Sequence, residues 1–280
     1  MKKILLLSMV VSSMLFAEVE TSIAINTDLG VGSYNLDIQG SNYVRSIAYD
    51  VTEVTVGVFE NIGTSWQYGV SYRGVVKEIS TNAYVPRTGG KDSANIDRSE
   101  WLFEVNYLFD IENIVNKNVT TRDVDIGEEK LSLNMIFYKS SLNASNQFAL
   151  GSIFNQYYKY DTQGAKVSLH YNLLPNNDDY NFWLTGGVVY TNADLDFEEY
   201  KDGNLQPYYV NSSVDAVGYN FGVGMSYDIN NQTSIKAIAD WYRVDFGDID
   251  VMSRTQSLLG KASFEENTAS VRLGVAYKFD

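Results

Sequence analysis

The sequence contains no cysteine, only three prolines and a single histidine, His170. Without cysteine there is no disulfide framework, no lipid-anchored cysteine at the N-terminus and no thiol nucleophile. With only one histidine, zinc sites of the histidine and cysteine kinds are excluded as well. Beyond the N-terminus, no apolar run approaches the roughly 20 residues that a membrane-spanning helix needs. These absences exclude a helical membrane protein and the common thiol and zinc chemistries.

Positive charge is also scarce. The 280 residues carry 21 Lys and Arg against 35 Asp and Glu, which gives a formal charge of −14. Because phosphate backbones bind basic surfaces, we expect no nucleic-acid partner. The sequence shows no cofactor-binding motif, and we expect no cofactor.

The N-terminus has the pattern of an export signal. Lys2 and Lys3 form a basic start, and residues 4–16 form an apolar stretch of signal-peptide length. We expect cleavage after Ala17, so that residues 1–17 are a signal peptide and residues 18–280 form the mature domain. An anchor helix is the alternative, but the stretch is short for a membrane span.

Apolar and polar residues alternate in several segments. Between positions 268 and 280 one face carries Ala269, Val271, Leu273, Val275, Tyr277 and Phe279, and the other carries small and charged residues. Residues 66–76 and 101–109 alternate in the same way, with aromatic residues on the apolar face. A period of two predicts β-strands. The alternation fits either a soluble sandwich or a membrane barrel that shows its apolar face to lipid.

The connections between the predicted strands alternate in length. Those at 61–64, 175–179 and 229–232 are short, whereas those at 80–97, 192–213 and 247–265 are long and polar. Outer-membrane barrels combine short periplasmic turns with long extracellular loops. We therefore predict an all-β, transmembrane, antiparallel up-and-down β-barrel. Ten strands agree best with termini in the periplasm, with a long turn at 110–128, while eight or twelve are the alternatives.

Together the basic leader, the alternating strands and the aromatic final strand resemble the small outer-membrane β-barrels of Gram-negative bacteria. The resemblance implies a location in the bacterial outer membrane and contact with its lipid and lipopolysaccharide. It also implies that the barrel assembly machinery reads Tyr277 and Phe279, although Asp280 follows them here. We expect a monomer.

Charged residues on the small-residue faces are predicted to point into the barrel lumen. They are six basic and four acidic residues: Asp28, Glu53, Arg73, Lys77, Glu104, Lys166, Lys236, Asp240, Arg272 and Lys278. This composition predicts a mildly basic lumen with a weak preference for anions. The glycines at 218, 222 and 224 are expected to face inward as well, where they make room or allow curvature.

Three functions are compatible with such a barrel. The first is a narrow porin-like channel for small polar solutes, and the second is a closed structural or surface-interaction barrel with ligand-contacting extracellular loops. The third is an outer-membrane hydrolase, because barrels similar to the omptin proteases, the lipid A deacylase and the palmitoyltransferase are enzymes. We expect no enzyme here, since those families place catalytic groups near the outer end and His170 is predicted near the periplasmic end. The acidic residues between 194 and 202 do not form an EF-hand, although they suggest a weak site for divalent cations.

Overall fold

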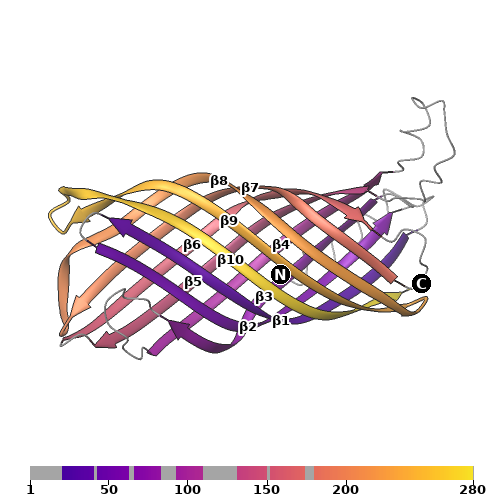
Figure 1. The fold of residues 1–280 in the computed structure, drawn as a ribbon, viewed down its shortest axis with the longest axis horizontal. Coiled ribbons are helices and arrows are strands. Elements are labelled where there is room, and N and C mark those ends of the chain that lie inside the picture. Colours follow the sequence, from indigo (N-terminus) through magenta and orange to yellow (C-terminus); the bar gives the residue numbers. More distant parts are fainter. Residues whose placement is uncertain are drawn as a thin grey trace, which may run out of the picture.

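The computed structural model describes residues 21–40, 43–62, 66–82, 93–109, 131–149, 152–173 and 180–279. The predicted signal peptide, the 110–128 segment and Asp280 lie outside these residues. The described residues form ten antiparallel strands in one closed barrel (Figure 1). The strands are β1 (Thr21–Gly40), β2 (Tyr43–Ile62), β3 (Trp66–Asn82), β4 (Ser93–Phe109), β5 (Leu131–Ala149), β6 (Ile153–Asn172), β7 (Tyr180–Lys201), β8 (Asn204–Asn230), β9 (Thr233–Ser253) and β10 (Leu258–Phe279).

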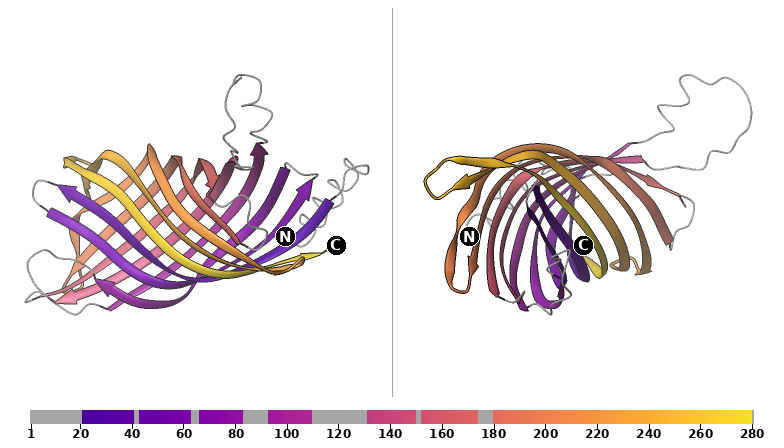
Figure 2. Two further views of the ribbon diagram at one scale, coloured as in Figure 1. Left: turned by 45° about the vertical axis from the view of Figure 1, so that its right-hand side comes forward. Right: turned by 60° about the vertical axis from the view of Figure 1, so that its left-hand side comes forward.

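Each strand pairs with its neighbours in sequence, and the first strand closes the ring on the last. The β1–β10 pairing runs from Ile23 opposite Phe279 to Gly40 opposite Ala262. Closure removes the sheet edges that would otherwise pair with other chains. Two turned views show the strands coiling around one common interior (Figure 2). The predicted ten-stranded, up-and-down barrel is confirmed. Among the described residues, no helix is long and apolar enough to span a membrane.

The strands are much longer than a membrane requires. They contain between 17 and 27 residues, whereas about 9–11 residues suffice for a tilted strand to cross a bilayer. We call the end of the barrel that holds Thr21 and Phe279 the terminal end, and the opposite end the distal end. Roughly half of each strand must therefore project beyond the hydrocarbon layer.

The first strand shows how the two halves differ. Near the terminal end, Ile23 and Leu29 are exposed on the outer wall, and Asp28 points inward and is buried. Further along the same strand, Leu36 is buried inside and Ser33 is exposed outside. The side-chain parity does not change, but the polarity of the two faces is exchanged. The terminal half is built like a membrane barrel and the distal half like a soluble one.

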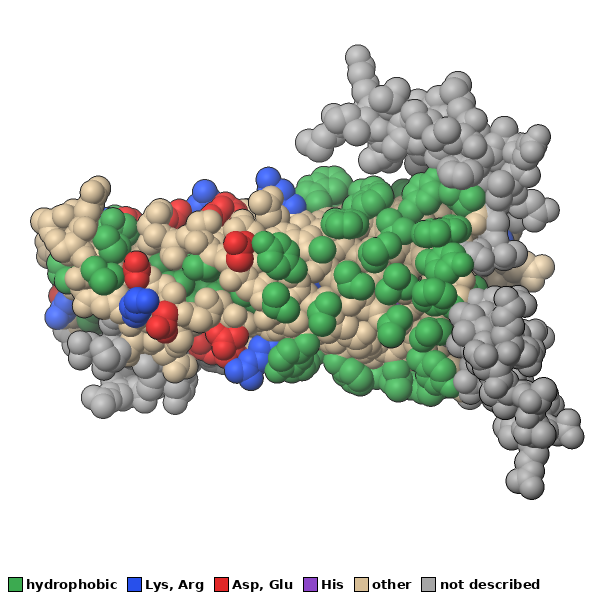
Figure 3. Space-filling view, turned by 90° about the horizontal axis from the view of Figure 1, so that it is seen from above, with side chains coloured by type: hydrophobic (Ala, Val, Ile, Leu, Met, Phe, Trp, Pro, Cys, Tyr) green, Lys and Arg blue, Asp and Glu red, His purple; other side chains and the backbone are tan. Residues whose placement is uncertain are grey.

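The outer wall shows the same division over the whole face in view. Hydrophobic side chains cover the terminal half, and Lys, Arg, Asp and Glu side chains lie over the distal half (Figure 3). On β10 the exposed apolar residues of the terminal half run from Val271 to Phe279, and Leu258 and Leu259 are exposed at the distal tip. The band on this strand is the stretch from Val271 to Phe279. At about 3.4 Å per residue and a tilt of about 40°, this stretch rises roughly 20 Å, close to the apolar band of outer-membrane barrels.

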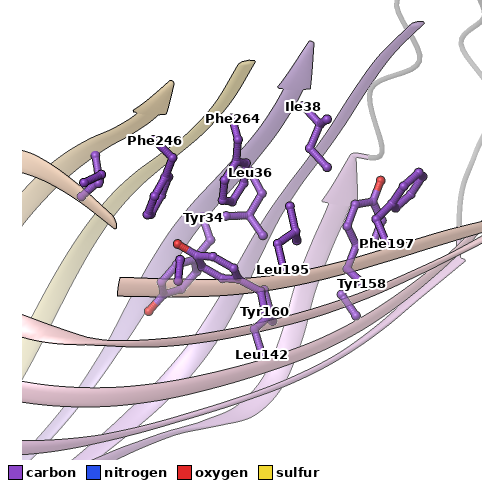
Figure 4. Close-up of a cluster of buried hydrophobic side chains, with 14 of the residues drawn as sticks. Tyr34, Leu36, Ile38, Leu142, Tyr158, Tyr160, Leu195, Phe197, Phe246 and Phe264 are labelled. Carbon is purple, nitrogen blue, oxygen red and sulfur yellow. The ribbon is translucent and has the colours of Figure 1, made fainter. Parts of the chain in front are cut away.

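The interior of the distal half is filled with apolar side chains, which we call the distal core. Residues from opposite walls point toward one another there (Figure 4). Phe246 and Phe264 stack with ring centroids 4.7 Å apart, and Tyr160 meets Phe264 edge-on at 5.5 Å. The labelled members are Tyr34, Leu36, Ile38, Leu142, Tyr158, Tyr160, Leu195, Phe197, Phe246 and Phe264. The interior of this half is therefore a hydrophobic core rather than a polar cavity.

The prediction of long loops is largely wrong, because most of these residues belong to strands. Residues 192–213 form the ends of β7 and β8, and most of residues 247–265 belong to β9 and β10. The stretch 80–97 shrinks as well, since β3 continues to Asn82 and β4 begins at Ser93. These segments are polar because their outer faces meet water above the membrane, not because they are irregular.

The β7–β8 hairpin turns at Asp202 and Gly203. Both residues have positive φ, 50° and 78°, as a tight two-residue hairpin turn requires. The backbone N–H of Ile153 donates a 2.8 Å hydrogen bond to the Asp202 carboxylate. This bond holds the pKa of Asp202 below its usual range and ties the tip of the hairpin to β6.

Candidate functional site

The interior of the terminal half encloses a cavity of about 740 Å³, which we call the terminal cavity. Polar and charged side chains from all around the ring line it together with apolar ones such as Phe59 and Trp183, and it reaches the terminal end at Ser22 and Lys278. Eight of the ten predicted lumen-facing charges line it: Asp28, Arg73, Glu104, Lys166, Lys236, Asp240, Arg272 and Lys278. Glu53 is buried in the interior as well.

Lys77 is the exception, and its predicted position is wrong. The pairing of β2 and β3 shifts between Thr52 and Glu53, so that Val75 lies opposite Glu53 and Lys77 opposite Thr52. The extra residue is Val76. A β-bulge of this kind moves the following side chains to the other face, and Lys77 is exposed on the outer wall.

Ion pairs connect the charges around the terminal cavity. Lys236 Nζ lies 2.9 Å from Asp28 Oδ1, and Arg73 Nη1 lies 3.2 Å from Glu100 Oε2. Arg272 pairs with Asp240. Lys166 lies over the Tyr242 ring, 4.3 Å from its centroid. Partly buried charges that are paired and fixed in this way stiffen the wall and reduce the cost of taking charge out of water.

Beyond the cavity, four side chains from opposite walls meet in what we call the cross-barrel network: Arg98, Tyr160, Tyr242 and Glu266. The Tyr160 hydroxyl donates a 2.7 Å hydrogen bond to Glu266 Oε2, and the Tyr242 hydroxyl donates one of 2.5 Å to Oε1. Arg98 Nη1 lies 3.7 Å from Glu266 Oε1. Around the ring, three strands separate β10 from β4 and three separate it from β6. These contacts therefore cross the lumen.

The network forms the boundary between the two halves of the interior. Tyr242 also lines the terminal cavity, while Tyr160 packs into the distal core. The Arg98 guanidinium stacks 3.9 Å from the centroid of the Tyr34 ring. Burial, reinforced by the Glu266 carboxylate, raises the pKa of the Tyr160 hydroxyl well above its usual value. Tyr160 therefore stays protonated and remains a hydrogen-bond donor at any physiological pH.

Four further charged residues point into the interior and were not predicted to do so, namely Arg98, Glu100, Glu199 and Glu266. All four are buried. Glu199 lies in the segment interpreted as an acidic loop, and Arg98 and Glu266 directly follow segments interpreted as loops. With these residues added and Lys77 removed, the buried or cavity-lining charges of the described residues are six basic and seven acidic. The expected basic lumen, and with it the expected anion preference, is not supported.

His170 lies on the terminal half of β6 and lines the terminal cavity. Its cross-strand neighbours are Ser132 on β5 and Thr185 on β7. This is the predicted end of the barrel, far from the distal surface. Among the described residues, no group of three or more His, Asp or Glu side chains is placed to hold a metal ion. In the acidic stretch between 194 and 202, Glu199 points inward, where Gln156 donates a 2.7 Å hydrogen bond to it.

The final strand and the three glycines have the predicted orientations. Tyr277 and Phe279 face outward at the terminal end, with their rings edge-to-face at 4.8 Å. Gly218, Gly222 and Gly224 are buried on the inner face of β8. The indole of Trp183 lies directly over Gly224, and a β-carbon there would collide with its ring. This glycine therefore makes room for an aromatic side chain.

Comparison with known proteins identifies the family. The family model of the OmpA-like transmembrane domain matches residues 137–280, which is just over half of the chain. The chain belongs to the OmpA-like transmembrane domain family. No match is found among curated proteins. Membership in this family and the closed barrel together place the protein in the bacterial outer membrane.

Solved structures of other outer-membrane barrels resemble this OmpA-like chain. The outer membrane protease OmpT of Escherichia coli shares 11% sequence identity, with a TM-score of 0.64 over 92% of this chain and 97% of OmpT. The translocator domain of the autotransporter NalP from Neisseria meningitidis also shares 11% identity, with a TM-score of 0.51 over 91% of this chain and 88% of that one. At this level of identity the similarity concerns the fold alone.

Proposed function

We propose that the protein is a closed, non-enzymatic barrel that presents a rigid interaction surface above the outer membrane of a Gram-negative bacterium. It is exported by the signal peptide at residues 1–17, inserted by the barrel assembly machinery through Tyr277 and Phe279, and stands in the membrane as a monomer. The distal end faces the exterior. The interacting surface is the outside of the long distal strands rather than irregular loops.

The observation that carries this proposal is the closure of the lumen at two successive levels. At the cross-barrel network, Tyr160 and Glu266 are in hydrogen-bonding contact from opposite walls. Above it the distal core fills the interior, and Phe264 and Val251 within it are 0% and 1% exposed. A solute would have to displace packed aromatic rings to pass, and protein interiors of this kind are packed as densely as organic crystals.

A narrow porin-like channel is the second candidate, and the terminal cavity favours it. Its charged lining and volume suit small polar solutes. A hydrolase has less support, because His170 lies in this cavity in the terminal half, whereas the enzymatic barrels place their catalytic groups near the outer end. In the closed barrel we expect this cavity to be a water-filled vestibule that ends at the cross-barrel network.

Planar-bilayer recording distinguishes the closed barrel from the channel. We expect the purified, refolded protein to give no stable conductance steps, under conditions in which a wide porin added to the same chamber gives them. Insertion is checked independently by heat-modifiable migration on SDS gels of protein recovered from vesicles of the same lipid. Stable, ohmic steps that scale with the amount of protein would contradict the closed barrel and support the channel.

A further inference from the structure

A hollow of about 670 Å³ lies on the outer wall of the distal half, and we call it the distal groove. It is separate from the terminal cavity, and most of its lining side chains have the outward parity of β4 to β8. Its floor is formed by Ala144, Tyr158 and Val210, which belong to the distal core. The volume falls within the range of sites that bind small ligands. In contrast to a loop cluster, the groove is built on paired strands, which hold its side chains in fixed register.

Cross-strand pairing places one row of the groove. Ser145 on β5 pairs with Tyr157 on β6, Tyr157 with Glu198 on β7, and Glu198 with Tyr209 on β8. Tyr157 is 50% exposed, although it lies well beyond the apolar band. An exposed aromatic ring fixed in water, here edge-on against Tyr200 at 5.6 Å, offers a flat apolar face to a ligand.

A second row lies beside the first, two residues nearer the membrane. Asp97 on β4 pairs with Asn143 on β5, Asn143 with Lys159, Lys159 with Asp196, and Asp196 with Asn211. The row contains two amides and three charged groups. Amides and carboxylates together supply donors and acceptors side by side. Such groups suit vicinal hydroxyls, which donate and accept at neighbouring positions.

Arg254 closes one side of the groove from the turn between β9 and β10. Its Nη1 lies 2.9 Å from Glu198 Oε1, and its guanidinium lies 5.0 Å from the centroid of the Tyr209 ring. Its backbone N–H donates a 3.0 Å hydrogen bond to the carbonyl of Pro207. Arg254 is therefore held in place by the protein itself, and Glu198 is neutralised.

The charge of the groove selects against acidic ligands. Its carboxylates are Asp97, Asp196 and Glu198, and its cations are Lys159 and Arg254. Arg254 is paired with Glu198, and Lys159 lies 3.4 Å from Asp161 just outside the groove. Phosphate, sulfate and carboxylate groups need unpaired cations. A neutral polyhydroxyl ligand is the class that matches the stacking ring, the amides and the slight negative charge.

The position of the groove indicates the source of such a ligand. On β7 the last exposed apolar residue of the band is Tyr190, and Asp196 lies six residues further along. At about 3.4 Å per residue and a tilt of about 40°, the groove lies roughly 15 Å above the band. Because it opens sideways on the barrel wall, it faces the sugar layer of the lipids that surround the barrel.

We propose that the distal groove binds the neutral core sugars of the surrounding lipopolysaccharide, with Tyr157 stacking on a sugar ring. The inference rests on the proposed function, since it requires the distal half to stand outside the membrane. It gives the interaction surface a ligand, and it ties the barrel laterally to its own membrane.

The test is a titration of the refolded protein with delipidated, dephosphorylated core oligosaccharide, followed through the NMR signals of the sugar. We expect saturable binding, an affinity at least tenfold lower for Tyr157→Ala and for Asn143→Ala, and no change for Asn35→Ala. Asn35 is the matched control, because it lies on the outer wall of β1, on another side of the barrel. All variants are first shown to be folded by heat-modifiable migration.

Three results would overturn the proposal. They are no binding by folded wild-type protein, equal binding by wild type and Tyr157→Ala, or equal binding of an unrelated neutral oligosaccharide, which would exclude recognition of lipopolysaccharide. Bilayer recordings are independent of the groove. If the protein gives no conductance and also binds no sugar, the inference about the distal groove is wrong, and the proposal of a closed barrel still holds.

Discussion

Replacing Glu266 with alanine is expected to lower the free energy of unfolding by about 3–5 kcal/mol, the cost of removing one partner of a buried ion pair. Glu266 is 2% exposed, and its carboxylate accepts hydrogen bonds from Tyr160 and Tyr242. Without it, Arg98 is left as a buried cation and two buried hydroxyls lose their acceptor. The measurement is equilibrium urea unfolding in lipid vesicles, followed by the tryptophan emission.

The adjacent residue provides the control. Glu265 pairs with Arg243 at 2.5 Å on the outer wall, where both side chains are partly exposed. Because exposed ion pairs contribute at most about 1 kcal/mol, the free energy of unfolding of Glu265→Ala should be close to that of the wild type. An equal decrease in the free energy of unfolding for the two variants would contradict a buried Glu266 that bonds to the opposite wall of a closed interior.

Phe264→Ala is expected to cost about 3–5 kcal/mol in the same assay, the range for a large side chain removed from a packed core. Phe264 is 0% exposed and lies between Phe246 and Tyr160. Backbone pairing holds β10 to β1 on one side and to β9 on the other at this position, so the space can collapse only in part. A residual cavity should remain in the distal core.

Phe221→Ala is the matched control, since Phe221 is 52% exposed on the outer wall of the apolar band. Lipid chains can fill the space that this ring leaves, so no cavity remains. We therefore expect the free energy of unfolding to fall by only about 1 kcal/mol. A Phe264→Ala variant as stable as Phe221→Ala would contradict a packed distal core and would point to a wet, open lumen.

The strands of the terminal half were predictable because their outer faces form unbroken apolar rows. The alternation at 268–280 and at 101–109 follows from lipid on one side and a polar interior on the other. The distal strands were missed for the opposite reason. There the outer face is polar, and in the stretch 192–213 this polarity was interpreted as a loop. The dipeptide Asp202-Gly203, a strong signal for a hairpin turn, could have revealed that hairpin.

Parts of the interior could not be derived from one chain segment at a time. Lys77 changes sides because of a bulge that depends on how β3 pairs with β2. Arg98 and Glu266 are far apart in sequence, and only the closure of the ring brings them together. The alternation of loop lengths predicted the correct class of fold, although most of the supposed long loops are strands that extend beyond the membrane.

The exchange of polarity along each strand explains how one barrel serves two solvents. In the terminal half, lipid solvates the outer wall and a polar cavity occupies the inside. In the distal half, water solvates the outer wall and the hydrophobic effect acts inward, on Leu36 and Phe264 for example. The distal half can then stand above the membrane without flexible loops, which gives the groove at Tyr157 a rigid base.

The most direct test of this account is the accessibility of spin labels in two positions on β10. The sequence has no cysteine, so Val271→Cys in the terminal half and Ser263→Cys in the distal half each give one label on the outer wall. We predict that in vesicles the label at 271 collides mainly with oxygen, which concentrates in lipid, and the label at 263 mainly with a water-soluble nickel chelate. Oxygen preference at both positions would mean that lipid covers the whole barrel, and would contradict the account.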